Sequence, residues 1–460
     1  MNAPRYRSVG RVLSSLTLAA ACSLPISAGA AETYWNDVTY LTSERTFADV
    51  DAGRTHADDF AVRDISYCDM SLASGWMERF QCCQQQMSES GIVYNGDLVQ
   101  FYQGVTSGGV ETGFEYGGKV DQFLTLDSTK LGLWQGMTAV MHVETRFGED
   151  VNQKAVGLAP VNVAMLYPNA DEHDTAITGL QFAQAVTDEV QLTFGKFNSL
   201  DLFYMLYPET GRGVNGFMNG SMVIPLAVAR VFPLSFLGAG VLKFEGTQAQ
   251  GGLMVYDPHN CTTTSGFENL GDNGVNIFGF WRFFTEVGGL PGSHAFGFSG
   301  ATGEFTSLDP EGFVFVPGQG IVATQQSNSW AAIYILQQRL WQDGCNPDRN
   351  VGVLSQWCIA DEDTSPFQWT GNVAIQGSGF VAARPSDSAG VGYFYTGLSS
   401  QFQSLVSPVL DLHDLHGVEL YYNAALSKCF GLTSDLQVIE PADSTNDTAV
   451  VFGLRGVAVF

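Results

Sequence analysis

Ionisable side chains occupy alternate positions in three short segments, so each group would share one face of an extended strand. The segments contribute Lys119 with Asp121, His142 with Glu144 and Arg146, and Arg282 with Glu286. Neighbouring carboxylates and cationic groups either transfer protons in catalysis or hold a hydroxyl-bearing solute by hydrogen bonds. Either chemistry would leave further signs in the sequence.

The catalytic signatures GxSxG, HExxH and GxxxxGK[ST] do not occur in the chain. Acidic pairs are plentiful, but none is singled out as a glycosidase pair. We therefore expect no enzyme activity and no cofactor, and we interpret the seven residues as solute-binding groups. The alternative is that they only solvate a polar wall.

The chain after Asn95 has the two-residue period of strands with one apolar and one polar face. Apolar residues alternate with Thr138, His142, Glu144 and Arg146 in 137–147, and the division recurs in 276–286 and 418–426. These segments recur at hairpin-plus-loop spacing, which is wider than the spacing in β-sandwiches. The pattern favours an antiparallel membrane β-barrel whose polar face lines the lumen.

The last strand, 448–460, is apolar on one face, carries Arg455 on the other and stops at Phe460. A final strand that ends in Phe resembles the signature read by the outer-membrane assembly machinery. That machinery is therefore an expected partner.

The first thirty residues have the layout of a secretory signal peptide. Arg5, Arg7 and Arg11 precede an apolar run, and Ala28-Gly29-Ala30 supplies a cleavage site. Removing these three arginines from the 21 basic residues leaves 18 against 47 acidic ones, a net charge of −29. Because nucleic acids are also negatively charged, a chain this acidic is not expected to bind them.

Residues 31–94 are expected to form a leader that ends in one amphipathic helix. Trp76, Phe80, Cys83 and Met87 have helical spacing, and Gly91 follows as a stop signal. The helix either packs on the end of the main domain or partly enters a barrel mouth. The barrel itself is assigned to 95–460.

Export makes disulfides chemically feasible. Cys68 with Cys82 or Cys83 is one candidate local pair, and Cys345 with Cys358 is another. The cysteines and nearby histidines do not complete a zinc pattern, so no metal is expected.

One apolar stretch, 222–242, is long enough to span a bilayer as a helix. Pro225 and Pro233 interrupt it, and each proline lacks a backbone donor. We therefore predict strand, turn and strand there.

Several segments, in shared order along roughly residues 75–460, resemble the carbohydrate-selective porin family of the OprB type. They are 116–121 (YGGKVD), 130–136 (KLGLWQG), 142–152 (HVETRFGEDVN), 194–197 (FGKF), 217–220 (FMNG), 256–258 (YDP), 289–294 (GLPGSH), 383–385 (ARP), 421–424 (YYNA) and 436–439 (LQVI). The usual glycine-rich entry to the family's first helix is replaced here by Ser74-Gly75-Trp76-Met77.

The resemblance implies a sixteen-stranded outer-membrane barrel that passes monosaccharides such as glucose by passive diffusion. Outer-membrane lipid is then a further expected partner. Whether the barrel forms a homo-oligomer stays open. A general ion porin, a secreted soluble glycan-binding β-protein and a barrel plugged by its N-terminal segment are the rival hypotheses.

Overall fold

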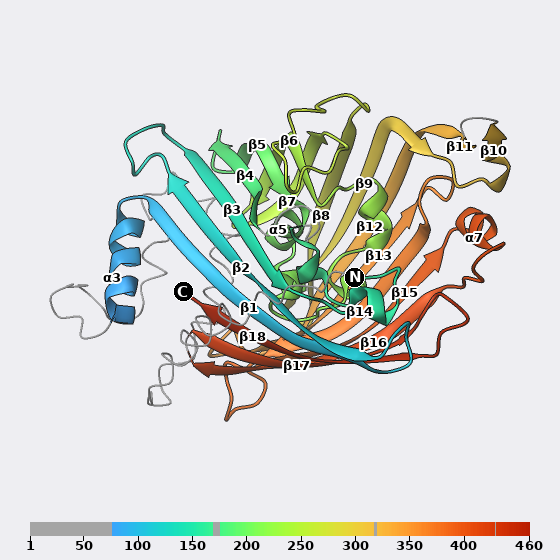
Figure 1. The fold of residues 1–460 in the computed structure, drawn as a ribbon. Coiled ribbons are helices and arrows are strands. Elements are labelled where there is room, and N and C mark those ends of the chain that lie inside the picture. The colour runs from blue at the N-terminus through green and yellow to red at the C-terminus, as the bar shows by residue number, and fades with distance from the viewer. Residues whose placement is uncertain (1–75, 169–174, 317–319, 428) are drawn as a thin grey trace, which may run out of the picture.

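The computed structural model describes residues 76–168, 175–316, 320–427 and 429–460. Sixteen antiparallel strands form a closed barrel in which the last strand, β18, pairs with the first, β1 (Figure 1). Closure confirms the expected all-β barrel, and it leaves no strand edge unpaired in lipid. The barrel strands are β1 (Ile92–Ser107), β2 (Gly113–Asp127), β3 (Met137–Gly148), β4 (Thr175–Ala185), β5 (Val190–Asn198), β6 (Ser235–Glu245), β7 (Gln248–Tyr256), β8 (Asn276–Val287), β9 (Leu290–Thr306), β12 (Gln325–Gln342), β13 (Asn350–Ala360), β14 (Phe367–Ser378), β15 (Ser388–Leu398), β16 (Leu415–Ser427), β17 (Phe430–Glu440) and β18 (Ala449–Val459).

The predicted two-residue alternation divides the wall into an outer apolar face and an inner polar face. On β8, Trp281 and Phe283 are exposed on the outside, while Arg282 between them is buried toward the lumen. On β18, Phe452 and Leu454 point outward and Arg455 is fully buried. The face assignments made from the sequence are therefore confirmed on these strands.

The two ends of the barrel differ in the length of their connections. We call the end with the connections 186–189, 246–247 and 288–289 the short-turn end, and the opposite end, with 199–234 and 257–275, the long-loop end. Outer-membrane barrels place short turns in the periplasm and long loops outside. The long-loop end also carries a two-stranded hairpin, β10 (Phe313–Val316) with β11 (Gly320–Ala323), and the helix α7 (Ser400–Val406).

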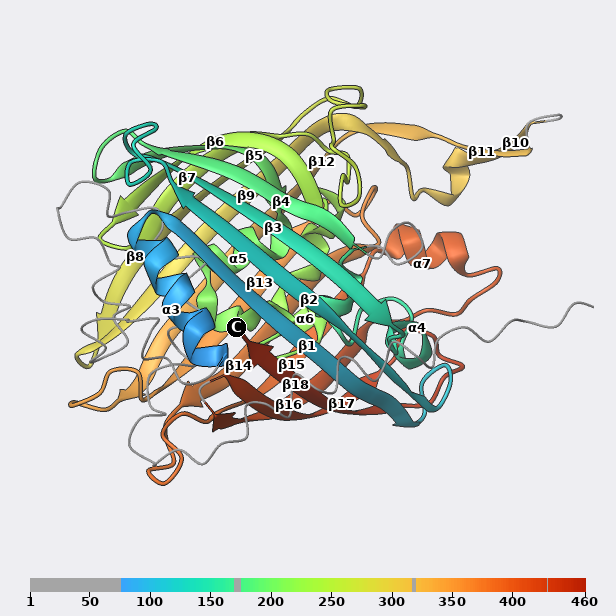
Figure 2. The same cartoon turned by 60° about the vertical axis from the view of Figure 1, so that its left-hand side comes forward.

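The N-terminal helix α3 (Trp76–Glu89) is present as predicted, and Gly91 after it adopts a φ of 92°. α3 lies beside the start of β1, near the C-terminus (Figures 1 and 2), and Gln84 Nε2 donates to Tyr94 O at 2.9 Å. This placement agrees with a helix packed on the end of the main domain. Among the described helices, none combines the length and hydropathy of a membrane span.

Residues 199–234, which we call the inner loop, connect β5 to β6 and fold into the barrel. They contain α5 (Ser199–Leu206), η3 (Pro208–Gly213), α6 (Gly220–Val223) and η4 (Leu226–Arg230). A second inward segment, between β3 and β4, contains α4 (Asn152–Ala155) and η2 (Val163–Leu166). The predicted strand, turn and strand over 222–242 is wrong for its first half, because only Ser235 onward is a strand.

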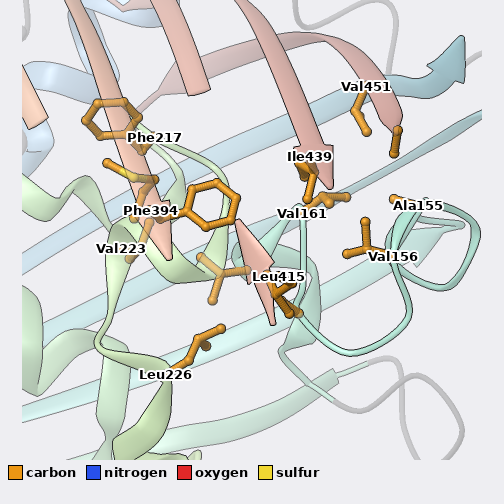
Figure 3. Close-up of a cluster of buried hydrophobic side chains, with 14 of the residues drawn as sticks. Ala155, Val156, Val161, Phe217, Val223, Leu226, Phe394, Leu415, Ile439 and Val451 are labelled. Carbon is orange, nitrogen blue, oxygen red and sulfur yellow. The ribbon is translucent and has the colours of Figure 1, made fainter. Parts of the chain in front are cut away.

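The first half of this stretch is not a strand because it belongs to the inner loop, which is buried inside the barrel. Figure 3 shows Phe217, Val223 and Leu226 packed against Phe394 and Leu415 of the wall, in one buried apolar cluster. Apolar residues in this stretch cover an apolar patch of the lumen wall instead of facing lipid. Hydropathy alone does not distinguish the two environments.

Candidate functional site

The inner loop is attached to the wall by hydrogen bonds from lumen-facing side chains on several strands. Asn372 Nδ2 donates to Ser221 O at 2.7 Å, and Gln356 Nε2 donates to Met222 O at 3.2 Å. Further along, Asn276 Nδ2 and Tyr256 OH both donate to Val231 O, at 2.7 and 3.0 Å. A buried carbonyl without a donor would cost about 1–3 kcal/mol, so these contacts fix the path of the loop.

On one side of the lumen, seven residues form what we call the ionic cluster. Its members are Asp97 of β1, Lys119 and Asp121 of β2, His142 and Glu144 of β3, and Asp201 and Arg212 of the inner loop. Lys119 Nζ lies 2.7 Å from Glu144 Oε1 and 3.1 Å from Asp121 Oδ1. The strand register places Asp97 opposite Asp121, and Asp121 opposite Glu144, which explains why side chains so distant in sequence meet.

The inner loop enters the ionic cluster through Asp201 and Arg212. His142 Nδ1 lies 2.6 Å from Asp201 Oδ2, and Arg212 reaches Asp201 at 3.1 Å and Asp97 at 3.4 Å. Burial alone would raise the pKa of Asp201, but the charges on His142 and Arg212 outweigh it and lower that pKa below its usual value. The cluster thus joins α5 and η3 to the wall.

Across the seam where β18 pairs with β1, Arg455 of β18 and Glu419 of β16 hold the middle of the inner loop. Arg455 donates to Gly213 O and Gly216 O, both at 2.9 Å, and to Thr433 Oγ1 at 3.1 Å. A carboxylate oxygen of Glu419 accepts from Asn219 N at 3.1 Å, and the other accepts from Met218 N. The inner loop is therefore anchored by buried charged groups on both sides of the β1–β18 seam.

The structure brings four of the seven residues predicted from the sequence together in the ionic cluster. Lys119, Asp121, His142 and Glu144 do face the lumen side of the wall, but the inner loop covers them and each is at most 3% exposed. The remaining three lie elsewhere. Arg146 is bonded to Asp150 and to Met165 O, Arg282 donates to Leu206 O and stacks on Tyr207, and Glu286 is exposed at the short-turn end of β8.

The disulfide prediction is wrong for Cys345 with Cys358, because both are free thiols. Cys345 lies in the turn before β13, whereas Cys358 lies eight positions beyond its first residue, Asn350. At a rise of about 3.3 Å per residue they are separated by far more than a disulfide spans. Cys83 is also free, while Cys82 is disulfide-bonded. Cys68 lies outside the described residues.

A polar cavity of about 520 Å³, which we call the solute cavity, lies between the inner loop and the short-turn end. Gln337 Nε2 donates to Glu209 Oε2 at 2.6 Å, and Gln376 Nε2 donates to Glu209 O at 2.8 Å. Tyr421 OH donates to Gln376 Oε1 at 3.2 Å, and Arg339 donates to Asn350 Oδ1. Most other polar lining groups are neutral amides and hydroxyls, among them Gln248, Asn215, Ser293 and Ser388.

Sequence reasoning missed this lining because it searched for charged residues. The same two-residue period that located His142 and Glu144 also places Gln337 on the lumen face of β12, so a search for neutral amides would have found it. Glu209 carries no such signal, because it lies in the inner loop and its position depends on how that loop folds.

The family model that describes a carbohydrate-selective porin, OprB family, matches residues 111–460. The chain belongs to this family. As an OprB porin it is a carbohydrate porin of the bacterial outer membrane, and its fold and family are those of a channel. No curated protein sequence matches the chain.

Solved structures share the fold of this OprB porin. The high-pH structure of Pseudomonas putida OprB superposes with a TM-score of 0.70 at 18% identity, covering 83% of this chain and 97% of that chain. The low-pH structure of the same protein gives a TM-score of 0.51 at 13% identity, covering 83% and 96%. At these identities the likeness shows the fold alone.

Proposed function

We propose that neutral sugars cross this porin through the solute cavity and that its amides bind their hydroxyl groups. The observation that supports the proposal is that amide, hydroxyl and carboxylate groups converge on the wall of one polar cavity, from Gln337, Gln376, Glu209 and Tyr421. Amides offer both donors and acceptors, as a sugar hydroxyl requires, without a net field that would favour ions.

Passive sugar passage has a direct test in liposomes. Liposomes carrying the purified porin should swell in isotonic glucose and in other neutral monosaccharides, because solute and water enter together. A soluble glycan-binding protein or a plugged barrel gives no swelling. Swelling in sugar that is no faster than in a salt of similar size would favour a general porin.

Replacing Gln337 by Leu should weaken sugar binding in the channel. The substitution removes the donor to Glu209 and the acceptor for Ser293 Oγ, which lies 3.3 Å away. One lost hydrogen bond is worth about 0.5–1.5 kcal/mol, or roughly 2–12-fold in affinity. Sugar-induced current noise in planar bilayers measures the affinity. Leu336→Met, one position along on the lipid side, is the control and should leave it unchanged.

We also propose that the assembly machinery recognises the last strand through Phe460. Supporting this, Phe460 closes the barrel seam, where its backbone exchanges two 2.8 Å hydrogen bonds with Gly96. A Cβ on Gly96 would lie 2.5 Å from the Phe460 ring, so the glycine makes room for the aromatic side chain.

Phe460→Ala should lower the yield of folded barrel in cells, measured by heat-modifiable migration on gels. Phe452→Ala removes another outward aromatic from the same strand and is the matched control. Refolding of both variants in detergent, where no machinery is present, separates recognition from stability. Equal losses for the two variants in cells would contradict the proposal.

A further inference from the structure

Three potential metal ligands meet within the ionic cluster. One ligand atom from each of Asp121, His142 and Glu144 lies within 4.8 Å of the others. All three side chains are at most 2% exposed, and they come from adjacent positions of β2 and β3. Three protein ligands on rigid strands are the number that zinc sites with one further position use.

Unused polar atoms point into the space between these residues. Oδ2 of Asp121 and Nε2 of His142 are buried and lack a hydrogen-bond partner among the described residues, while Oδ1 of Asp121 is in the ion pair with Lys119. The nearest approach between them is 3.5 Å, from His142 Nε2 to Asp121 Oδ1. Buried polar atoms without partners are rare in folded proteins, and a bound ion is one way in which such atoms are satisfied.

The histidine is oriented as a metal ligand would be. Asp201 Oδ2 lies 2.6 Å from His142 Nδ1, and an ionised carboxylate can only accept, so Nδ1 carries the proton. Displacement of the other ring proton by a metal would leave the lone pair on Nε2, which faces Asp121. In metal sites, a ligating histidine usually donates the hydrogen of its other ring nitrogen to a carboxylate, which fixes the orientation of the ring.

The charges of the cluster also favour a further cation. Four carboxylates, Asp97, Asp121, Glu144 and Asp201, face two permanent cations, Lys119 and Arg212. With His142 protonated between Asp121 and Asp201, three cations face four ionised acids, and one negative charge remains buried without compensation, which is costly. The Lys119 ammonium lies between Asp121 and Glu144 at the end of a flexible side chain, so the space between these two acids already holds a cation.

The geometry points to a divalent transition-metal site formed by Asp121, His142 and Glu144, which is filled when the ammonium of Lys119 moves aside. One nitrogen and two oxygen ligands suit zinc and its neighbours, whereas calcium and magnesium prefer oxygen ligands in larger number. Through Asp201, the bound metal holds α5 of the inner loop against β3. The inference does not depend on which solute crosses the channel.

The test uses the full-length porin, stripped with a chelator, refolded in detergent and titrated with zinc chloride by calorimetry. We expect saturable binding of one zinc per chain, no comparable binding of magnesium, and a Co²⁺ absorption band of tetrahedral type. His142→Gln should abolish binding, and Asp201→Asn should weaken it by about 10–100-fold. His259→Gln is the matched control, because His259 forms the same kind of pair with Asp257, at 2.7 Å, in an outer loop.

Heat-modifiable migration shows which variants are folded, and Asp201→Asn keeps the test valid if His142→Gln does not fold. Zinc binding that survives both substitutions, or that disappears with His259→Gln, would overturn the proposal. So would zinc binding seen only after Lys119→Met, because the ammonium would then be the permanent occupant.

Discussion

Arg455→Met should release the inner loop and strongly destabilise the barrel. Arg455 is fully buried, and its guanidinium supplies donors to Gly213 O, Gly216 O and Thr433. Removing it leaves two loop carbonyls without donors and takes away a positive charge that interacts with the buried acids Asp435 and Glu419. Breaking a buried charge network of this kind costs about 3–5 kcal/mol in the free energy of unfolding.

Urea unfolding in detergent measures this loss of stability. Single-channel recordings measure the mobility of the inner loop, because a released loop should cause current fluctuations that the wild type does not show. Arg349→Met is the matched control, because Arg349 pairs with Asp343 at 2.7 Å in a short turn where both side chains are partly exposed. Exposed ion pairs contribute little, so its effect should be much smaller. Equal effects of the two substitutions would show that the inner loop does not depend on its anchor.

Ser388→Trp should reduce ion conductance and sugar permeation severalfold. Ser388 lines the solute cavity at the start of β15, and a Trp side chain there would fill part of its volume of about 520 Å³. Ala389→Trp is the control. It adds the same side chain one position later, where the alternation of the strand directs it to the lipid side.

The pair is measured by single-channel conductance and liposome swelling on barrels shown to be folded. A Trp at position 389 suits the aromatic girdle at the membrane interface and should leave both rates unchanged. A normal conductance for Ser388→Trp would mean that solute bypasses the cavity.

The barrel wall was predictable because its physics is local. A strand between lipid and water must alternate, so His142, Glu144 and Arg455 could be assigned to the lumen face from sequence spacing alone. The strand number came from the family resemblance, and the closed sheet confirms it.

The interior was less predictable because it depends on contacts between distant segments. Met222 and Leu226 look like lipid-facing residues in sequence, yet they pack on Phe394 and Leu415 inside the barrel. For the same reason the sequence showed Lys119 and Glu144 as open pore groups, whereas Asp201 and Arg212 arrive from the inner loop and bury them. Glu209 reaches the cavity only through the fold of that loop.

The most direct test of the central claim, that sugars bind in the solute cavity as they pass, is single-channel conductance in planar bilayers with glucose titrated in. We predict an open channel whose current is blocked by glucose in a dose-dependent, saturable way, and a weaker block in Gln337→Leu. An open channel whose current glucose does not block, or whose block is unchanged in Gln337→Leu, would contradict the claim.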